Sequence, residues 1–377
     1  MIRRCLCFLI CLPLVFMLCG CWNYQGLDQM ALVLGIAVDF DQEADKYRVT
    51  YEVADLTSPI ENGLKGKIVE AEGSTLFDAA RNAKRRLEDK LYFGSSNIIV
   101  VSQGIARERG IMSVIEWFLR DGECRETMCL LVSQEDSAAA ILMSGEQEGG
   151  AVSLHVHDII KEDNKATSST SDIRMFQAYN QLKGKGISLT LPAFRKVMND
   201  KEKICEANGM AVFKEDKLLG YLSPHESKYV LFIQDHVQGG ILTLPVTGNQ
   251  RDDASLEISN SRTKKSYVRE EGQIKFKVET DTAVFLAESP AGFDTGSPEQ
   301  IKRLEERASQ MIEENIQEVI RKVQADYHSD IFGFGEMIYR KDYQLWRQLE
   351  GDWDELFPTV QVEVSSRVHL LNSAFIR

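Results

Sequence analysis

The sequence predicts an α+β fold in which mixed and antiparallel sheets are flanked by helices, and three observations predict it. The apolar run 31–38 and the alternating segment 47–53 are separated by a polar turn, which is typical of a hairpin. The strands and helices that follow lack the regular strand–helix–strand alternation of a doubly wound sheet. A long helical stripe then occupies 298–325, in the second half of the chain.

The residues before the first strand read as an export signal. Arg3 and Arg4 precede an apolar run over 5–18, and the small residue Gly20 stands just before Cys21. The apolar run is too short for a permanent membrane helix, which needs roughly 20 apolar residues. Residues 1–20 are therefore predicted to be a signal peptide.

Leu18, Gly20 and Cys21 fit the lipobox pattern of bacterial lipoproteins. We therefore expect cleavage before Cys21 and a lipid on its sulfur, with Cys19 less suitable because the residue before it is large. The alternative is an ordinary secretory signal, cleaved near the same position, that releases a soluble protein starting at Trp22.

The charge of the chain limits its partners. It has 44 basic and 57 acidic residues and a formal net charge of −13. Nucleic acid and anionic lipid headgroups should both repel such a chain, so no nucleic-acid partner is expected. Attachment to a membrane would then depend on the lipid at Cys21.

Few cysteines remain for the folded part. Five of the eight cysteines lie at or before Cys21, which leaves Cys124, Cys129 and Cys205. An odd number gives no disulfide framework, and we expect free, mostly buried thiols.

A chain of 377 residues exceeds what a single core usually contains. We expect a first α+β domain over 21–200, because the segment 198–207 is polar enough for a boundary. The second α+β region, 201–377, could divide again near 285–297.

In the first half, Ser74 is expected to cap a helix whose apolar positions run from Leu76 to Leu91. The polar segment 161–172 is expected to be a mobile loop, because its composition cannot bury a core. The other predicted elements are strands at 97–102 and 128–132, helices at 111–119 and 137–143, and an edge strand with Pro192 at 189–194.

The second half begins with a predicted hairpin, 209–213 and 218–222. Ser297 and Gln300 match a capping box around Pro298 at the start of the long helix, 298–325. The other predicted elements are extended segments at 229–233 and 240–246, a half-buried strand at 274–278, a helix over 345–357 and a last strand over 360–370.

The closest pair of histidines is His155 and His157. On a strand both rings would face one side, as metal ligands could, but no cysteine or third histidine accompanies them. We favour exposed histidines beside a loop.

Two charged segments have a structural and a binding interpretation. Asp39, Asp41, Glu43 and Asp45 resemble half of a calcium loop, but Ala44 replaces the required glycine, which favours a plain hairpin turn. The predicted helix after Ser74 carries a basic face, for which a solvated surface is favoured over an anion site. Its members are Arg81, Lys84, Arg85 and Arg86.

The segment Phe332-Gly-Phe-Gly-Glu336 resembles a phosphate-binding loop, but it lacks the lysine and serine and follows a helix instead of opening one. We favour a turn with packed phenylalanines and glycines at positive φ, over a ligand site or a docking surface.

No nucleophile elbow, His-Glu-x-x-His helix, Walker loop or dinucleotide-binding glycine motif occurs in the sequence. No catalytic, cofactor-binding or metal-binding residue is therefore assigned, and no cofactor is expected.

Several segments occur together in a specific order and spacing. They are Cys21-Trp22, Met30–Ile36 with Asp39, Phe118–Asp121, Gly209–Phe213 with Lys217–Gly220, and Asp330–Glu336 with Trp346 and Trp353. Taken together, these segments resemble the C subunit of spore germinant receptors, the Ger(x)C lipoprotein family of endospore-forming bacteria. The resemblance covers essentially the whole chain, and it departs from the family pattern at Asn23 and Gly26-Leu27, next to the expected lipid.

The resemblance implies a non-enzymatic lipoprotein on the outer face of the spore's inner membrane. It implies two integral membrane partners, the A and B subunits, in a complex that starts germination in response to nutrients. It also implies an elongated structure of up to three domains.

Two other functions stay open. A solute-binding lipoprotein of an importer would need two similar α/β lobes that face a cleft. An extracytoplasmic hydrolase is disfavoured by the missing motifs.

Overall fold

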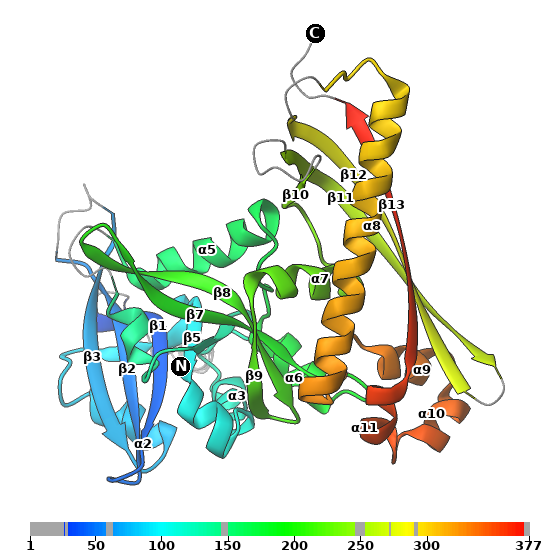
Figure 1. The fold of residues 1–377 in the computed structure, drawn as a ribbon. Coiled ribbons are helices and arrows are strands. Elements are labelled where there is room, and N and C mark those ends of the chain that lie inside the picture. Colours follow the sequence, from blue (N-terminus) through cyan, green and yellow to red (C-terminus); the bar gives the residue numbers. More distant parts are fainter. Residues whose placement is uncertain are drawn as a thin grey trace, which may run out of the picture.

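The computed structural model describes residues 26, 29–57, 63–144, 150–245, 253–270, 273–289 and 293–372. The predicted signal peptide, 1–20, and Cys21 lie outside these ranges. Within them the chain forms a nine-stranded sheet and a four-stranded sheet (Figure 1). Both sheets are flanked by helices, so the α+β fold class is confirmed.

The nine-stranded sheet has parallel strands at its centre and antiparallel pairs at both ends. The parallel strands are β1 (Met30–Asp41), β5 (Ile98–Ser102), β6 (Cys129–Ser133) and β7 (Thr190–Asn199). The antiparallel strands are β2 (Lys46–Asp55) and β3 (Lys65–Gly73) beyond β1, and β8 (Glu202–Lys214) and β9 (Lys217–Leu222) beyond β7. The two predicted hairpins, β1–β2 and β8–β9, are confirmed.

Helices cover both faces of this sheet. α2 (Leu76–Ala83), α3 (Met112–Arg120) and α6 (Met175–Lys183) share one core with Ile99 and Val101 of β5. α4 (Ala139–Leu142) and α5 (Val152–Ala166) share the opposite core with Ile98 and Val100. Since successive side chains of β5 enter opposite cores, its continuous apolar run is buried on both faces.

The helix expected after Ser74 is shorter than predicted and has a different cap. Thr75 accepts the hydrogen bond of the Asp78 N–H at 3.1 Å, and α2 ends at Ala83. Leu91 lies instead in β4 (Lys90–Tyr92), a short strand that pairs in parallel with the start of β1. The helical spacing of Leu91 was therefore misleading, because strand pairing decides its conformation.

The strand with Pro192 is not an edge strand, contrary to the prediction. β7 lies between β6 and β8, and β6 pairs with it only at Ala193 and Phe194. Pro192 stands just beyond that pairing, beside a bulge in the β8 ladder, so its missing N–H breaks no ladder bond to β6.

The segment 161–172 is a loop only after Ala166, and that loop is buried, contrary to the prediction from its composition. Residues up to Ala166 belong to α5, and Ser168 and Thr170 are fully buried. Their hydroxyls donate to the Gly239 and Gly209 carbonyls, both at 2.8 Å, so the polar side chains are satisfied inside the protein.

The chain passes residue 200 inside the nine-stranded sheet. Asp200 has a φ of 53° at the tip of the β7–β8 hairpin, and both strands of that hairpin belong to the same sheet. The domain boundary near residue 200 stays a prediction.

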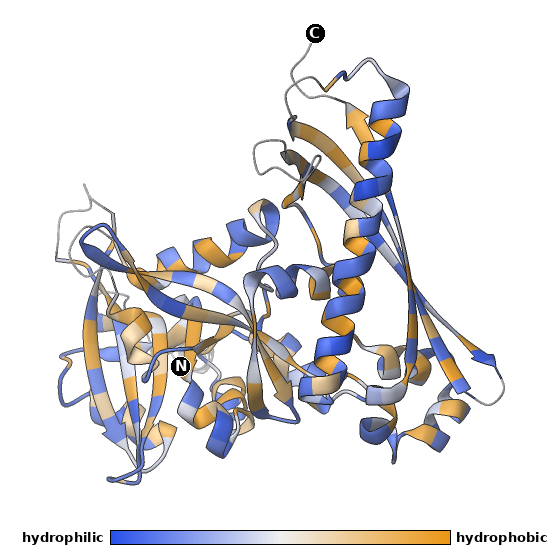
Figure 2. Ribbon diagram, in the orientation of Figure 1, coloured by the Kyte–Doolittle hydropathy of each residue, from blue (hydrophilic) through white to orange (hydrophobic). Residues whose placement is uncertain are grey.

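The second half contains a polar sheet covered by one long helix. β10 (Ile241–Pro245), β11 (Asp253–Glu270) and β12 (Gln273–Glu288) pair antiparallel, and β13 (Gln361–Asn372) pairs in parallel with β12. α8 (Pro298–Lys322) lies beside these strands with a buried apolar stripe, and Figure 2 shows apolar and polar residues alternating along it. The predicted long helix and last strand are confirmed.

The segment 229–233, predicted to be extended, lies in the helix α7 (Pro224–Gln234). Ser223 and Glu226 form a capping box at its start. All five residues from Tyr229 to Ile233 are buried, so the helix is apolar on every side there and the pattern shows no helical period.

Three short helices lie at one end of the four-stranded sheet (Figure 1). They are α9 (Phe334–Lys341), α10 (Tyr343–Leu349) and α11 (Trp353–Leu356). The single helix predicted over 345–357 is thus two helices, separated by a turn at Gly351.

Candidate functional site

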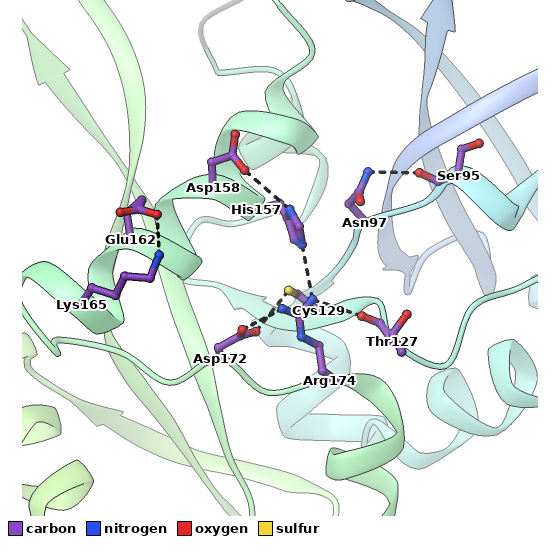
Figure 3. Close-up of polar contacts among 10 residues, drawn as sticks. All are labelled: Ser95, Asn97, Thr127, Cys129, His157, Asp158, Glu162, Lys165, Asp172 and Arg174. Carbon is purple, nitrogen blue, oxygen red and sulfur yellow. Dashed lines mark hydrogen bonds and ion pairs between the residues drawn. The ribbon is translucent and has the colours of Figure 1, made fainter. Parts of the chain in front are cut away.

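The two histidines lie on α5 and not on a strand, and because they are two positions apart their side chains point to nearly opposite sides of the helix. His155 is exposed, whereas the ring of His157 faces Arg174 at the start of α6 (Figure 3). Arg174 Nη1 donates to His157 Nε2 at 3.3 Å, and Arg174 Nη2 donates to Asp172 at 2.7 Å. Cys129 Sγ donates to the other oxygen of Asp172 at 3.5 Å. The structure therefore brings only one of the two histidines into a cluster.

The electrostatics of this cluster indicate a structural role. Burial, with Lys161 and Arg174 nearby, lowers the pKa of His157, so the ring is neutral near pH 7. Burial also raises the pKa of Cys129 to about 12, which keeps its thiol protonated and a poor nucleophile. Among the described residues no group of three or more His, Cys, Asp or Glu side chains could hold a metal ion.

The acidic residues at the end of β1 bind backbone N–H groups of two different segments. Asp39 accepts the backbone N–H groups of Ala138 and Ala139, at 2.7 and 3.0 Å, where α4 begins. Asp41 instead accepts the N–H groups of Glu43 and Ala44 within the turn, at 3.1 and 3.0 Å. The hairpin-turn interpretation of this segment is confirmed.

Glu52 has the same function for α5. It accepts the N–H groups of Val152 and Ser153, both at 2.7 Å, and the Ser153 hydroxyl. Its side chain is buried, and this burial raises its pKa although the donors oppose the shift. The positive end of the helix is therefore occupied by a carboxylate of the chain itself.

The segment Phe332–Glu336 opens a helix, contrary to the sequence-based interpretation that it only follows one. Gly333, at φ 71°, precedes α9, and both phenylalanines are fully buried, as predicted. Asp330 accepts the N–H groups of Phe332, Phe334 and Gly335, at 3.1, 3.2 and 2.8 Å. The anion that this loop binds is thus the carboxylate of Asp330.

Asp330 is buried, and desolvation raises its pKa to about 6 against the opposing effects of its N–H donors and Lys265. The amine of Lys265 donates to the Phe332 carbonyl at 2.6 Å, which fixes the same turn to β11. Sequence reasoning assigned no role to Asp330, Glu52 or Lys265. For Glu52 the sequence offered no distinguishing signal, because it continues the polar positions of the alternating strand β2 after Arg48 and Thr50.

The Asp330 turn also joins the two halves of the molecule. The Ser188 N–H donates to the Asp330 carbonyl at 2.8 Å, and the Glu336 N–H donates to the Gly186 carbonyl at 2.7 Å. The Ser329 hydroxyl donates to the Phe213 carbonyl of β8 at 2.7 Å. The turn at Asp330 is therefore bonded at three points to residues in the nine-stranded sheet or in the segment that leads into it.

The basic face of α2 and the residues after it is exposed, in agreement with the solvated interpretation. The opposite side of the helix buries Leu76, Ala79 and Ala83. Arg86 donates to the Glu70 carbonyl, and Arg81 lies 4.9 Å from the centroid of the Phe77 ring.

The three cysteines that follow Cys21 are free thiols, as predicted, and Cys129 and Cys205 are buried. Cys21 itself lies outside the described residues, and β1 starts nine positions after it. None of the helices in the described ranges has the length and apolar character that crossing a membrane requires.

Two sequence profiles match the chain. The profile described as "Spore germination protein N-terminal domain" matches residues 23–196, and "Spore germination B3/ GerAC like, C-terminal" matches residues 208–374. The residues between the two matches, 197–207, lie at the turn of the β7–β8 hairpin.

Several relatives match over nearly their full length. Spore germination protein KC of Bacillus subtilis (strain 168) is 24% identical over 402 residues, covering 98% of this chain and 96% of the relative. Spore germination protein B3 of the same organism is 24% identical, covering 94% of each chain. Spore germination protein GerQC of Bacillus cereus is 22% identical, covering 98% of this chain and 99% of the relative.

The fold matches a solved structure, described as the crystal structure of the GerBC protein. The TM-score is 0.59 at 21% sequence identity, and the match covers 90% of this chain and 97% of that one.

Proposed function

The chain belongs to the Ger(x)C family of germinant receptor C subunits and has a role in spore germination, and from this we propose that it works as a non-enzymatic, lipid-anchored subunit of a nutrient receptor complex. In this proposal Cys21 carries the lipid on the outer face of the spore's inner membrane. The partners are the integral membrane A and B subunits, on whose exposed parts the two halves dock.

The observation that carries the anchoring proposal is the position of Cys21. It ends a lipobox, and the first family profile begins at residue 23. The nine positions from Cys21 to Met30 can span at most roughly 30 Å when fully extended. A lipid on Cys21 would therefore keep the start of β1 close to the membrane surface and raise the local concentration of membrane partners.

The bonding of the polar clusters supports docking as the mode of action. The carboxylates of Asp39, Glu52 and Asp330 are each engaged by backbone N–H groups, and Asp172 is engaged by Arg174. These groups stabilise the chain itself. The surfaces are then the parts available to partners, and no substrate chemistry is assigned to the clusters.

A solute-binding lipoprotein of an importer is less well supported. That function needs two similar lobes, whereas here one half has a nine-stranded mixed sheet and the other a four-stranded sheet beside a long helix. Calorimetry of the purified protein with candidate nutrients separates the two functions, since tight direct binding would favour the solute-binding protein.

The anchoring proposal is tested by replacing Cys21→Ala and separating membrane from soluble fractions. We expect the variant to leave the membrane after a high-salt wash, which removes electrostatic attachment but not a lipid, and germination in response to nutrients to weaken. Cys19→Ala is the control, because it lies two positions away and leaves Cys21 in place. Retention of the Cys21→Ala variant after the salt wash would contradict the proposal.

Complex membership needs its own experiment. Affinity purification of this chain, from cells with and without the genes for the two membrane subunits, should recover both subunits only when they are made together. Purification of the chain alone from solubilised membranes that contain all three would contradict the proposed complex.

A further inference from the structure

A pocket of about 520 Å³ lies on the nine-stranded half, where the end of α2, the strand β4 and the end of α3 meet. Its chemistry differs from that of the acidic chain around it. The residues that determine this chemistry are Phe77, Arg81, Lys84, Leu91, Phe93 and Trp117.

The floor of the pocket is apolar. Leu91 and Phe93 are buried, and the Phe93 and Trp117 rings pack edge to face with centroids 6.1 Å apart. Phe77 stands at the rim with 52% of its surface exposed, which is unusual for a phenylalanine in a core-packing helix. The pocket therefore offers contact to an apolar group as well as to a charged one.

The rim of the pocket is positively charged. Four cationic residues line it against two acidic ones, Asp121 and Glu123, in a chain whose net charge is −13. Lys90 pairs with Glu123, and Arg120 pairs with Glu116 at 3.1 Å. Arg81 and Lys84 have no carboxylate partner among the described residues, since Arg81 contacts the Phe77 ring and Lys84 donates to the Glu88 carbonyl.

The pocket lies at the end of the sheet where β1 begins. Lys90 and Leu91 of β4 pair in parallel with Met30 and Ala31. Met30 comes nine positions after Cys21, so the pocket and the proposed lipid are connected by a short tether. If Cys21 is in the membrane, this end of the nine-stranded half is the end that is held near the lipid headgroups.

We propose that this pocket binds the headgroup of an anionic phospholipid of the membrane to which the chain is anchored. The phosphate is bound by Arg81 and Lys84, whose charges are free of carboxylates, and Phe77 enters the interfacial region beside the headgroup. The net charge of the whole chain does not prevent this, because exposed charges beyond about 10 Å are largely screened at physiological salt.

Binding of a headgroup in the pocket would give the chain a second membrane contact, in addition to the lipid at Cys21. A lipid chain alone leaves a tethered protein free to rotate, whereas a headgroup bound in the pocket orients the nine-stranded half relative to the membrane surface. The assignment of the pocket to this particular membrane rests on the proposed anchoring at Cys21. The affinity of the pocket for the headgroup does not depend on that anchoring.

The experiment uses the unlipidated mature chain starting at Trp22, which retains all of the described residues. Co-sedimentation is measured with vesicles of phosphatidylcholine alone and with vesicles that contain phosphatidylglycerol. We expect binding only to the vesicles with phosphatidylglycerol, and a loss of about tenfold or more for Arg81→Glu/Lys84→Glu, since each basic residue contributes to attraction at an anionic surface.

Arg85→Glu/Arg86→Glu is the control, because it makes the same change of charge on the same exposed segment outside the pocket. We expect this control to weaken vesicle binding by less than about threefold, because its two charges lie near the membrane surface without contacting the headgroup and are screened by salt. Equal losses for the two pairs would show a diffuse electrostatic contact and overturn the pocket proposal. So would an absence of binding to the vesicles with phosphatidylglycerol.

Phe77→Ala provides a second variant that leaves all charges in place, at a side chain exposed enough not to be needed for folding. We expect weaker vesicle binding with an unchanged dependence on salt concentration; unchanged binding would remove the apolar part of the proposal. Inorganic phosphate that binds the chain as tightly as the vesicles do would identify a soluble anion site and overturn the membrane assignment. Because the chain carries no lipid, none of these results depends on whether Cys21 is modified in cells.

Discussion

The indole N–H of Trp353 donates to the carboxylate of Asp330 over 3.3 Å, in a site where the other donors to that carboxylate are backbone N–H groups. This contact fixes α11 to the turn that begins α9. The same turn is bonded to Gly186 and Ser188 of the first half, so Asp330 organises the junction of the two halves. We expect this junction to hold the docking surfaces of both halves in one relative orientation.

Asp330→Asn should lower the free energy of unfolding by about 2–4 kcal/mol, because the amide presents N–H groups to backbone donors and leaves them unpaired in a buried site. Urea unfolding measures the change. Asp354→Asn is the control, since that side chain is 67% exposed in a surface ion pair with Lys214 and should change stability by less than about 1 kcal/mol. Equal effects of the two substitutions would contradict the role given to Asp330.

The contribution of Asp330 to stability should depend on pH. Its folded-state pKa of about 6 lies above the ordinary value of 3.8, so between these values the folded protein binds the proton more tightly than the unfolded chain. The stability of the wild type relative to Asp330→Asn should therefore fall as the pH rises from 4 to 6, by up to about 3 kcal/mol, and be constant above pH 7. Urea unfolding of both proteins across this range measures the difference. A difference that grows with pH would show instead that the folded protein favours the ionised carboxylate.

Gly186→Ala should weaken the junction of the two halves. Gly186 has a φ of +66°, and a Cβ atom there would stand 2.4 Å from the backbone of Gly335. We expect a loss of about 2 kcal/mol or more, with faster proteolysis near the junction. Gly351→Ala is the control, because a Cβ atom at Gly351 would meet nothing within 4 Å. Similar proteolysis of the two variants would contradict the close approach.

Glu52→Gln should destabilise the start of α5 by about 1–3 kcal/mol, because a buried carboxylate that accepts three hydrogen bonds is replaced by an amide with two donors. Hydrogen exchange should become faster in the first turn of α5 before other regions change. Glu70→Gln, on the neighbouring strand β3, is the control and should leave that exchange unchanged. Unchanged exchange at Val152 and Ser153 in Glu52→Gln would exclude the capping role.

The accessibility of the thiols tests the cysteine assignments. Burial raises the pKa of both Cys124 and Cys129 to about 12, so both should react slowly with thiol reagents in the folded protein. After unfolding, the lipidated mature chain should show three free thiols, since the sulfur of Cys21 is blocked, whereas an unlipidated chain that keeps Cys21 should show four. Fewer than three would reveal a disulfide.

Elements with a clear period were predictable from the sequence. The alternation after residue 46 and the stripe of α8 each face one buried surface, so local pattern and final structure agree. α7 was missed because its apolar residues are buried on every side, and β11 because its polar side chains hide the strand pattern. In both cases packing against distant elements decided the structure.

The buried carboxylates of Glu52 and Asp330 could not be assigned from the sequence for a different physical reason. Glu52 is bonded to residues about 100 positions away, and Asp330 to Trp353 through a turn that only the packed fold forms. The loop after Ala166 was expected to bury nothing, because its hydroxyls look solvated in the sequence, whereas Ser168 and Thr170 are fully buried. The acceptors of the loop hydroxyls, Asp163 and the carbonyls of Gly209 and Gly239, are supplied by the fold.

Mass spectrometry of the N-terminal peptide tests the proposed anchoring most directly. Cleavage before Asp28 of the protein from spore membranes should release a peptide that starts at Cys21 and carries a diacylglyceryl group, while Cys19 is absent from it. A peptide that starts at Trp22, or an unmodified Cys21 within an uncleaved leader, would contradict lipid anchoring as the basis of this subunit's function.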